Sequence, residues 1–179
     1  RLLEVIDQGG MGQILRATQE PMGREVAIKI MKAPQEQDAE KRFFKEAAIT
    51  SKLQHPNTVR IYDYGKEGEG TDDEVIFIAM ELLRGRSLRE EIREGPVEPL
   101  RCTRIYKQIC GALGEAHRQG VIHRDIKPSN IFMTGDESSF PKLLDFGLVK
   151  DVDGEGTELT KTGMVLGSPM YMSPEQVKS

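Results

Sequence analysis

The chain has 179 residues, 37% of them hydrophobic and 30% charged, which is long enough and apolar enough to bury the core of one domain. Its 25 basic and 29 acidic side chains give a net charge of −4, and this acidic balance argues against a nucleic-acid binder. The longest apolar run, residues 75–80, is far shorter than the roughly 20 residues of a transmembrane helix, so neither a membrane-spanning segment nor a signal peptide is predicted.

Strand patterns dominate the first half of the chain. The first 33 residues predict three strands, the first two joined by a glycine-rich turn at 9–12. Two more strands are expected at 58–64 and 75–82. The acidic, glycine-rich stretch 65–73 between them is predicted to be a solvated hairpin loop, because it lacks the ligand spacing of a calcium loop.

Helical spacing of apolar residues predicts helices at 40–53, 88–93 and 100–119. The residues expected to cap them are Asp38 and Ser87 at N-termini and Gly120 at a C-terminus. The change from strands to helices falls near 82–85. A long polar loop fills the end of the chain, with a last helical turn predicted near Pro174.

The two cysteines and three histidines lack the spacing of zinc ligands or of a disulfide framework. Cys102 and Cys110 are therefore expected to be packed thiols in a reducing compartment, which favours a cytoplasmic location. The sequence does not begin with Met and is interpreted as part of a longer protein.

Three glycines, Gly9, Gly10 and Gly12, stand between the first two predicted strands. A turn without Cβ atoms lets backbone amides come close to phosphate groups. An ordinary hairpin turn explains the same glycines equally well. A dinucleotide-binding fold is disfavoured, because a strand and not a helix follows, and no Walker-type lysine is present.

Lys29 ends the apolar stretch Val26-Ala27-Ile28. A lysine in a mostly buried strand needs a partner to keep its charge, and Glu46 on the following helix is a candidate. The alternative is an edge lysine that extends its ammonium group into solvent.

The densest polar cluster is His123-Arg-Asp-Ile-Lys-Pro-Ser-Asn130, between two short apolar runs. Within it Asp125 could accept a proton from a hydroxyl group. Asn130 and the later Asp145 could bind a hard cation through oxygen, as Mg²⁺ prefers. Taken singly, each cluster is also compatible with a capped turn.

In chain order the motifs are a glycine turn, Val-Ala-Ile-Lys29, a helical Glu46, His-Arg-Asp-x-Lys-x-x-x-Asn130, Asp-Phe-Gly147 and Ser-Pro-Glu175. This series resembles the motif set of the protein-kinase family, and the residues within its motifs are similar to those of the bacterial Hanks-type (PknB-like) serine/threonine kinases. The resemblance implies an α+β, two-lobed fold. Residues 1–83 would form an antiparallel sheet with one helix, and 84–179 an incomplete, mostly helical second lobe, because the family's later helices have no counterpart here.

The resemblance also implies residue roles. The ATP-binding residues would be Gly9, Gly10, Gly12, Ile14, Ala27, Lys29, Met80, Glu81, Leu83 and Phe132. The glycines would cover the phosphates, the apolar side chains would enclose the adenine, Met80 would be the gatekeeper, and the two residues near it would offer hinge backbone groups. The catalytic group would be Asp125 as base, Lys127 opposite the γ-phosphate, and Lys29 oriented by Glu46. Asn130 and Asp145 would bind Mg²⁺, for which Mn²⁺ could substitute.

A regulatory segment is implied between Asp145 and Glu175. Thr157, Thr160 and Thr162 lie in its middle and are predicted autophosphorylation sites, since a phosphate there could pair with Arg124. The alternative is that these threonines only solvate a loop. The expected partners are proteins with Ser or Thr acceptors and a second copy of the chain for phosphorylation in trans.

Two residues depart from the family pattern. Asp7 replaces the first glycine of the loop and is expected to weaken ATP binding. Thr50 replaces an apolar residue one turn beyond Glu46 and is expected to loosen the docking of that helix. With the missing helices, these departures favour one alternative, a non-catalytic pseudokinase or nucleotide-binding scaffold. A small-molecule kinase that shares the fold is a further alternative, which is disfavoured because residues 167–175 resemble a platform for protein substrates.

Overall fold

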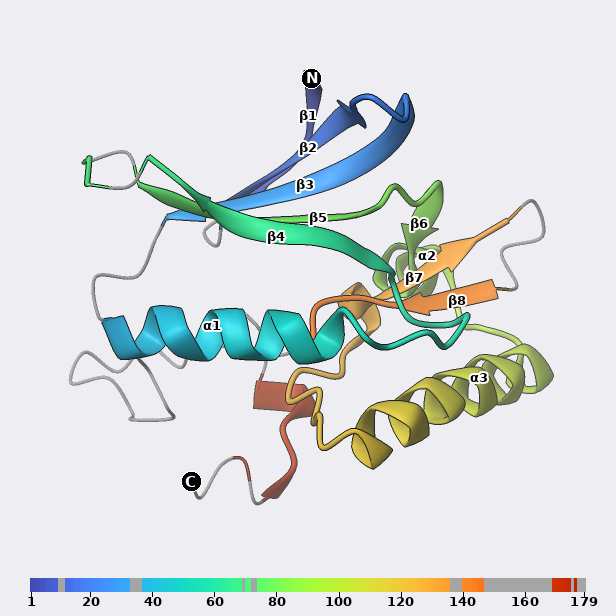
Figure 1. Ribbon diagram of the computed structural model, residues 1–179. Coiled ribbons are helices and arrows are strands. Elements are labelled where there is room, and N and C mark those ends of the chain that lie inside the picture. Colours follow the sequence, from blue (N-terminus) through green and yellow to red (C-terminus); the bar gives the residue numbers. More distant parts are fainter. Residues whose placement is uncertain are drawn as a thin grey trace.

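The computed structural model describes residues 1–9, 12–32, 37–68, 70–71, 74–135, 140–146, 169–174 and 176, with the side chains at 9, 37–39, 42, 46 and 169 left out. Figure 1 shows two groups of elements: an upper sheet with one helix beneath it, and a lower group of helices around a small sheet. The two groups meet where the chain leaves the upper sheet after residue 81.

The upper sheet is antiparallel, with strand order β1-β2-β3-β5-β4. Its strands are β1 (Leu2–Gly9), β2 (Gly12–Gln19), β3 (Arg24–Lys32), β4 (Ile61–Glu67) and β5 (Val75–Glu81). β3 alternates between buried and half-buried positions from Ala27 to Met31, so that Ala27, Lys29 and Met31 share one face of the sheet. The register sets Ala27 opposite Met80, which joins the middle of the sheet to its exit strand.

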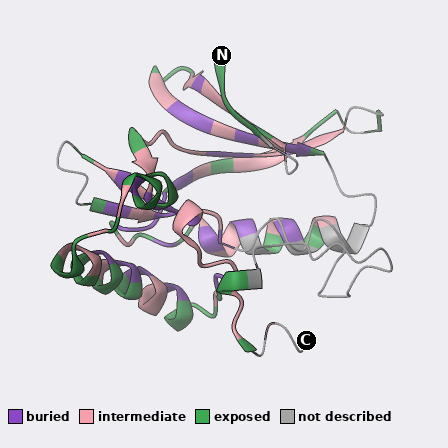
Figure 2. Cartoon of the chain, turned by 180° about the vertical axis from the view of Figure 1, so that it is seen from behind, coloured by how far each residue is buried: buried purple, intermediate pink, exposed green. Residues whose placement is uncertain are grey.

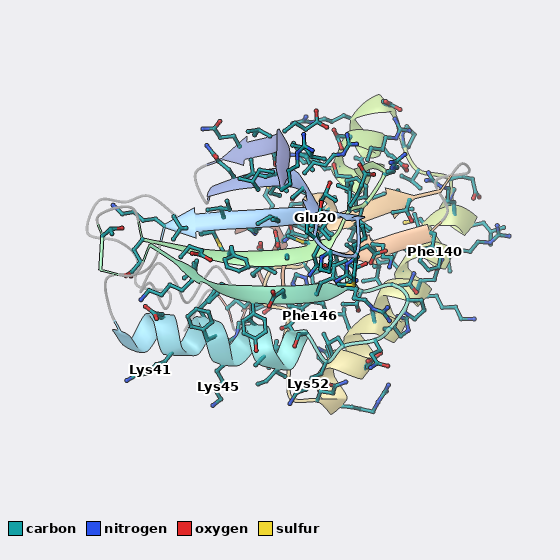
Figure 3. The ribbon with its side chains drawn as sticks, turned by 45° about the horizontal axis from the view of Figure 1, so that its top comes forward. Glu20, Lys41, Lys45, Lys52, Phe140 and Phe146 are labelled. Atoms are coloured by element: carbon teal, nitrogen blue, oxygen red, sulfur yellow. The ribbon has the colours of Figure 1, made fainter. Side chains whose placement is uncertain are left out.

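Helix α1 (Gln37–Thr50) packs beneath this sheet. Its buried residues Phe43 and Ala47 lie one turn apart and join Met31, Ile61, Ile76 and Ile78 in one apolar cluster. The opposite face of the helix carries Lys41 and Lys45, and Lys52 follows just beyond the helix end. The three lysine side chains point away from the sheet (Figure 3). Lys66 on β4 ties the helix to the sheet edge through an ion pair with Glu40 (Nζ–Oε2, 2.9 Å).

The lower group contains the three-stranded sheet β6 (Gly85–Ser87), β7 (Ile131–Thr134) and β8 (Phe140–Leu143), with helices α2 (Leu88–Glu94) and α3 (Pro99–Arg118) and the short 3₁₀ turns η1 (Pro128–Asn130) and η2 (Pro169–Tyr171). Helix α2 begins with a reciprocal cap between Ser87 and Glu90. The buried side of α3 faces this sheet (Figure 2). The core of this group consists of Leu53, Leu88, Ile105, Ile109, Ala116, Ile131, Met133, Leu143 and Phe146.

The connection between α1 and β4 is fastened to the lower group, although it precedes most of it in sequence. The amide of Leu143 donates to Asn57 O (2.7 Å), and the amide of Val59 donates to Leu143 O (3.0 Å). The side-chain amide of Asn57 also donates to Pro141 O (2.7 Å) and to Gln108 (3.0 Å). The end of β8 is thereby fixed against the α1–β4 connection.

Most predicted elements are confirmed, and the differences have local causes. Helix α1 begins at Gln37, so Asp38 lies in its first turn and is not the cap. Thr58 and Val59 leave the predicted strand because they pair with Leu143 of β8. At its other end β4 continues through Gly65 to Glu67, and a Cβ on Gly65 would lie 2.9 Å from the Phe77 ring. The short strand β6 was not predicted. No helix in the described part of the chain is long and apolar enough to cross a membrane.

Candidate active site

The glycine turn joins β1 to β2, which pair from Leu2 to Gly9. Gly12 has φ +121°, and a Cβ there would lie 2.1 Å from Ile30 O on β3. The close approach of β2 to β3 therefore requires a glycine at this position, whether or not the turn also covers a phosphate. Gly9 ends β1, whereas Gly10 lies outside the described residues.

Lys29 on β3 is buried, with 7% of its surface exposed. Its ammonium group forms an ion pair with Asp145 (Nζ–Oδ1, 2.9 Å), so the charge expected to need a partner has one. The predicted partner Glu46 lies on α1, but its side chain is outside what the structure describes, and the Lys29–Glu46 pair stays a prediction. The observed pair joins the upper sheet to the residue that follows β8 and Leu144.

Three of the predicted catalytic and metal-binding residues share one hydrogen-bonded group around the carboxylate of Asp125. Oδ2 of Asp125 contacts the ammonium group of Lys127 (2.9 Å) and accepts a hydrogen bond from Nδ2 of Asn130 (3.0 Å). The same Nδ2 donates to the backbone carbonyl of Asp125 (2.8 Å). Asn130 is buried, while the side chains of Asp125 and Lys127 keep about a fifth of their surface exposed. One oxygen of Asp125 is thus fixed from two sides.

His123 connects this loop to the segment that carries Asp145. Its Nε2 lies 2.7 Å from Leu144 O, which can only accept, so Nε2 carries the proton and Nδ1 is free to accept the amide of Asp125 (3.2 Å). The ring is 1% exposed and packs on Phe146, with 4.7 Å between ring centroids. Burial lowers the pKa of His123, against the hydrogen bond to Leu144 and the charges of Asp125 and Asp145, and this favours the neutral ring that the two bonds need.

The backbone at the site is unusual in two places. Arg124 has φ +61° and Asp145 has φ +49°, and they are the non-glycine residues with positive φ in the described part of the chain. Such conformations cost of order 1 kcal/mol or more and persist where the surroundings hold them. Both residues lie directly beside a hydrogen-bonded anchor: Arg124 follows His123, and Asp145 follows Leu144, whose amide donates to Asn130 O (2.9 Å).

The oxygen donors near the site fit a small, hard cation bound together with a phosphate. Nδ2 of Asn130 donates its hydrogen bonds to Asp125, which leaves the amide oxygen as a ligand for a cation. The carboxylate of Asp145 keeps 39% of its side-chain surface exposed beside Lys29. Mg²⁺ is commonly bound by only one or two such protein oxygens, with phosphate and water completing the shell. Within the described ranges no group of three or more His, Cys, Asp or Glu side chains could hold a metal by itself.

The residues predicted to contact a nucleotide base lie on both groups of elements. Ile14 (β2), Ala27 (β3), Met80 (β5) and Leu83 (after β5) come from the upper group, and Phe132 (β7) from the lower. The side chain of Glu81 accepts a bond from Lys142 (2.9 Å) and from the amide of Arg60 (3.2 Å). Its own amide donates to Arg60 O (2.9 Å), so a nucleotide could use only its carbonyl oxygen.

A family model described as "Protein kinase domain" matches residues 1–179. The chain belongs to the protein kinase domain family. The predicted family and the α+β, two-lobed architecture are thereby confirmed, with β1–β5 and α1 as the strand-rich lobe.

Relatives of this kinase domain are named as serine/threonine kinases. It is 40% identical to "Serine/threonine-protein kinase pkn3" of Myxococcus xanthus, over 99% of the chain and 33% of the relative. It is 40% identical to "Serine/threonine-protein kinase PrkC" of Bacillus subtilis, over 99% of the chain and 26% of the relative. It is 37% identical to "Serine/threonine-protein kinase PknA" of Mycobacterium tuberculosis, over 98% of the chain and 41% of the relative. The chain thus spans well under half the length of these relatives.

Solved kinase structures share the fold. Rad53 1–466 in complex with AMP-PNP superposes with a TM-score of 0.69 at 30% identity, over 82% of this chain and 38% of that one. A mutant form of the PknI kinase domain of Mycobacterium tuberculosis gives a TM-score of 0.70 at 24% identity, over 82% of this chain and 58% of that one. The second likeness concerns the fold alone.

Some predicted residues of the kinase domain cannot be placed. Thr157, Thr160 and Thr162 lie outside the described residues, as does the backbone of Glu175. Two residues that hold the catalytic loop, residues 123–130, were given no role from the sequence. His123 lies within the loop and makes the bonds described above, and Gln176 lies outside it and donates from its side-chain amide to Arg124 O (2.7 Å). The pattern Ser-x-x-Gln at 173–176 is a helix-capping signature and could have indicated Gln176.

The kinase domain also has a cavity of about 170 Å³ away from these catalytic residues. It lies behind Glu81 and Lys142 and is otherwise lined by the α1–β4 connection and the start of β4: Leu53, Gln54, His55, Pro56, Thr58, Arg60 and Tyr62. Among the predicted nucleotide-contacting residues that the structure describes, Glu81 alone lines it, so this cavity is not the nucleotide site.

Proposed function

We propose that this domain is an ATP-dependent protein serine/threonine kinase, which transfers the γ-phosphate of ATP to a Ser or Thr hydroxyl group of a protein. The observation that carries the proposal is the fixed group of Asp125, Lys127 and Asn130 beside the Lys29–Asp145 ion pair. The group joins a proton acceptor, two ammonium groups for phosphate oxygens, and oxygen donors for a cation.

In this mechanism Asp125 accepts the proton of the acceptor hydroxyl group. The oxygen of that hydroxyl group forms a bond to the γ-phosphorus at the same time. The bond between that phosphorus and the bridging oxygen of ATP breaks, and ADP leaves with the electron pair. Lys127, whose ammonium group lies 2.9 Å from Oδ2 of Asp125, would neutralise charge on the transferred phosphoryl group. Lys29 would exchange or share its contact with Asp145 for the α- and β-phosphates, and Glu46 would then orient it.

ATP binding is supported by the order of the motifs along the chain and by the elements that carry them. The glycine turn would cover the phosphates, and Ile14, Ala27, Phe132 and Met80 would enclose the base, with Glu81 O and Leu83 as hinge groups. Asn130 and Asp145 would bind Mg²⁺, or Mn²⁺ in its place, which supplies charge neutralisation at the phosphates. The lobes would divide between residues 83 and 84.

Regulation, partners and location extend the proposal. Autophosphorylation of Thr157, Thr160 or Thr162 in trans would pair the phosphate with Arg124 and order the segment after Asp145. Proteins with Ser or Thr acceptors are the expected substrates. A cytoplasmic location fits a phosphate donor that cells keep in that compartment. Cys102 and Cys110 are both free thiols, but Cys110 is exposed and not packed as expected.

The test is Asp125→Asn, measured with radiolabelled ATP, Mg²⁺ and casein as a generic acceptor. Asparagine keeps an oxygen for Lys127 and Asn130 but cannot take the proton, so phosphate transfer should fall by about 100-fold to 10,000-fold. Thermal unfolding with Mg²⁺ and ADP is the control. Ligand at 100 times its Kd should still stabilise the variant by about 2.7 kcal/mol.

Other outcomes separate the alternatives. A domain that binds Mg²⁺ and ADP but transfers no phosphate, to casein or to itself, is not a protein kinase and is left as a scaffold or a small-molecule kinase. Asp145→Asn provides the matched comparison, because it should weaken the stabilisation by Mg²⁺ and ADP that Asp125→Asn preserves.

A further inference from the structure

The peptide unit between Arg124 and Asp125 is held at both of its polar atoms. Its N–H, from Asp125, donates to Nδ1 of His123 (3.2 Å). Its carbonyl oxygen, from Arg124, accepts a hydrogen bond from Nε2 of Gln176 (2.7 Å). Because this peptide unit is bonded to Cα of Asp125, a change in its orientation would also move the Asp125 side chain.

This peptide plane needs outside support because Arg124 is in the left-handed region, with φ +61°. A residue with a Cβ pays of order 1 kcal/mol or more for that conformation and would relax from it if the contacts were lost. His123 supports the plane from within the loop. Gln176 supports it from a segment 52 residues away in sequence, which in Figure 1 runs beside the catalytic loop.

Gln176 itself is fixed by a second set of bonds. Its Oε1 accepts a hydrogen bond from the amide of Ser173 (3.2 Å), and the Ser173 hydroxyl lies 3.4 Å from the same oxygen. Ser173 and Gln176 are spaced as in the capping box at a helix N-terminus, with Pro174 between them at a favoured first position. The oxygen end of the amide serves the cap, and the nitrogen end remains to reach Arg124 O.

We propose that Gln176 is a positioning residue for the catalytic base. Gln176 lies in the part of the chain that follows segment 147–168. From there it holds the carbonyl group of Arg124 and so fixes the orientation of the Asp125 side chain. The inference rests on the proposed function, since it assigns Asp125 as the base. It explains a choice of residue type: glutamate completes the same cap but has no N–H for Arg124 O, whereas glutamine does both.

The test compares Gln176→Glu and Gln176→Ala with the wild-type protein in its full natural length. With casein and Mg²⁺–ATP, both variants should lower kcat by about threefold to tenfold, the rate equivalent of one half-exposed hydrogen bond, and leave the KM for ATP unchanged. Ser173→Ala is the matched control. It removes the weak hydroxyl contact but keeps the backbone amide that holds Gln176, so its kcat should stay near that of wild type.

A second measurement does not depend on activity. Hydrogen–deuterium exchange of the peptide covering residues 121–127 should be faster in Gln176→Glu and Gln176→Ala than in wild type and Ser173→Ala. Unchanged exchange of that peptide in both glutamine variants overturns the inference, even if the protein transfers no phosphate. If the wild-type protein transfers no phosphate but the two glutamine variants show the faster exchange, the proposed function is overturned. The support of the loop by Gln176 is then retained.

Discussion

The catalytic loop, residues 123–130, and the hairpin of β1 and β2 both border the proposed nucleotide site, but they are held in different ways. In the loop, His123 and Asn130 are buried and bond to named backbone atoms. In β1, by contrast, the apolar side chains Leu2, Leu3, Val5 and Ile6 are between 44% and 60% exposed. The ion pair of Arg16 with Glu4 lies on the surface there.

The difference follows the tasks that the two regions would have. A proton acceptor works only at a fixed distance and angle from the reacting hydroxyl, so the loop around Asp125 gains from buried bonds to its backbone. A cover over phosphates must open to release ADP, and such covers belong to the least stable parts of a domain. A backbone ladder with surface ion pairs, each contributing about 0–1 kcal/mol, suits that task.

Asn130→Asp should have the largest effect, because it breaks the more rigid region at its centre. A carboxylate cannot donate the bonds that Nδ2 makes to Asp125, and its charge repels the Asp125 carboxylate. We expect kcat to fall by about 100-fold or more, as a small misplacement of the base suffices for such a loss. Asn57→Asp is the matched control: it should lower Tm by breaking the bond to Pro141 O, while the folded protein keeps its kcat.

The pH dependence of stability tests the same region through His123. Because burial lowers its pKa in the folded state below the ordinary value of 6.5, the unfolded chain binds the proton more readily. The contribution of the neutral ring is complete above pH about 6.5 and is lost as the pH falls from there towards the folded-state pKa. Urea unfolding from pH 8 to pH 5 should show this decrease in wild type and a smaller one in His123→Asn. Equal slopes in the two proteins would contradict the assignment.

Thr50 lies outside both regions, at the end of α1. It is 2% exposed, and its hydroxyl oxygen is buried without a hydrogen-bond partner among the described residues. Thr50→Val removes that unpaired group and should raise the free energy of unfolding by about 1 kcal/mol, or Tm by about 2–4 °C. The hydroxyl group of Thr103 donates to Pro99 O, so Thr103→Val should give no such gain in the free energy of unfolding. A Tm for Thr50→Val at or below that of wild type would show that the hydroxyl is not a cost.

Asp7 should give the smallest effect, because it lies in the lightly held region. It is exposed, and its Oδ1 accepts the amide of Gln8 (2.9 Å). At an exposed site, removing one carboxylate near a triphosphate is worth only a few tenths of a kcal/mol, so Asp7→Gly should lower the KM for ATP about twofold. Asp7→Asn separates charge from backbone freedom and should produce most of the decrease. An unchanged KM in both variants would remove Asp7 as an influence on ATP binding.

Local features of the fold could be predicted from sequence, and non-local ones could not. The cap of α2 at Ser87 and the left-handed Gly120 (φ +76°) after α3 are set by neighbouring residues, and both predictions are confirmed. The three-residue β6 was missed because its partner β7 lies more than forty residues later. Gly65 was assigned to a loop, yet it pairs with Phe77 of β5 and continues β4, and a glycine is needed there because the Phe77 ring occupies the space of a Cβ.

The same distinction applies to the site. Asp125 and Asn130 were predicted because they stand close together in one polar cluster of the sequence, and the role of Lys127 was predicted from the family resemblance. The contact of Lys29 with Asp145 and that of Gln176 with Arg124 depend on how distant segments meet, and no local pattern specifies them. Lys29 had been assigned to Glu46, a partner nearer in sequence, and that pairing stays untested.

The attachment of the α1–β4 connection to β8 has a consequence for synthesis on the ribosome. Asn57 and Pro141, which share a hydrogen bond, are 84 residues apart in sequence. At a synthesis rate of roughly 5–20 residues per second, the interval between the addition of Asn57 and that of Pro141 is about 4 to 17 seconds. During that interval Leu53, which belongs to the core formed with Ile105 and Leu143, has no complete apolar environment. The nascent strand-rich lobe therefore exposes part of its α1–β4 connection until the lower sheet has been made.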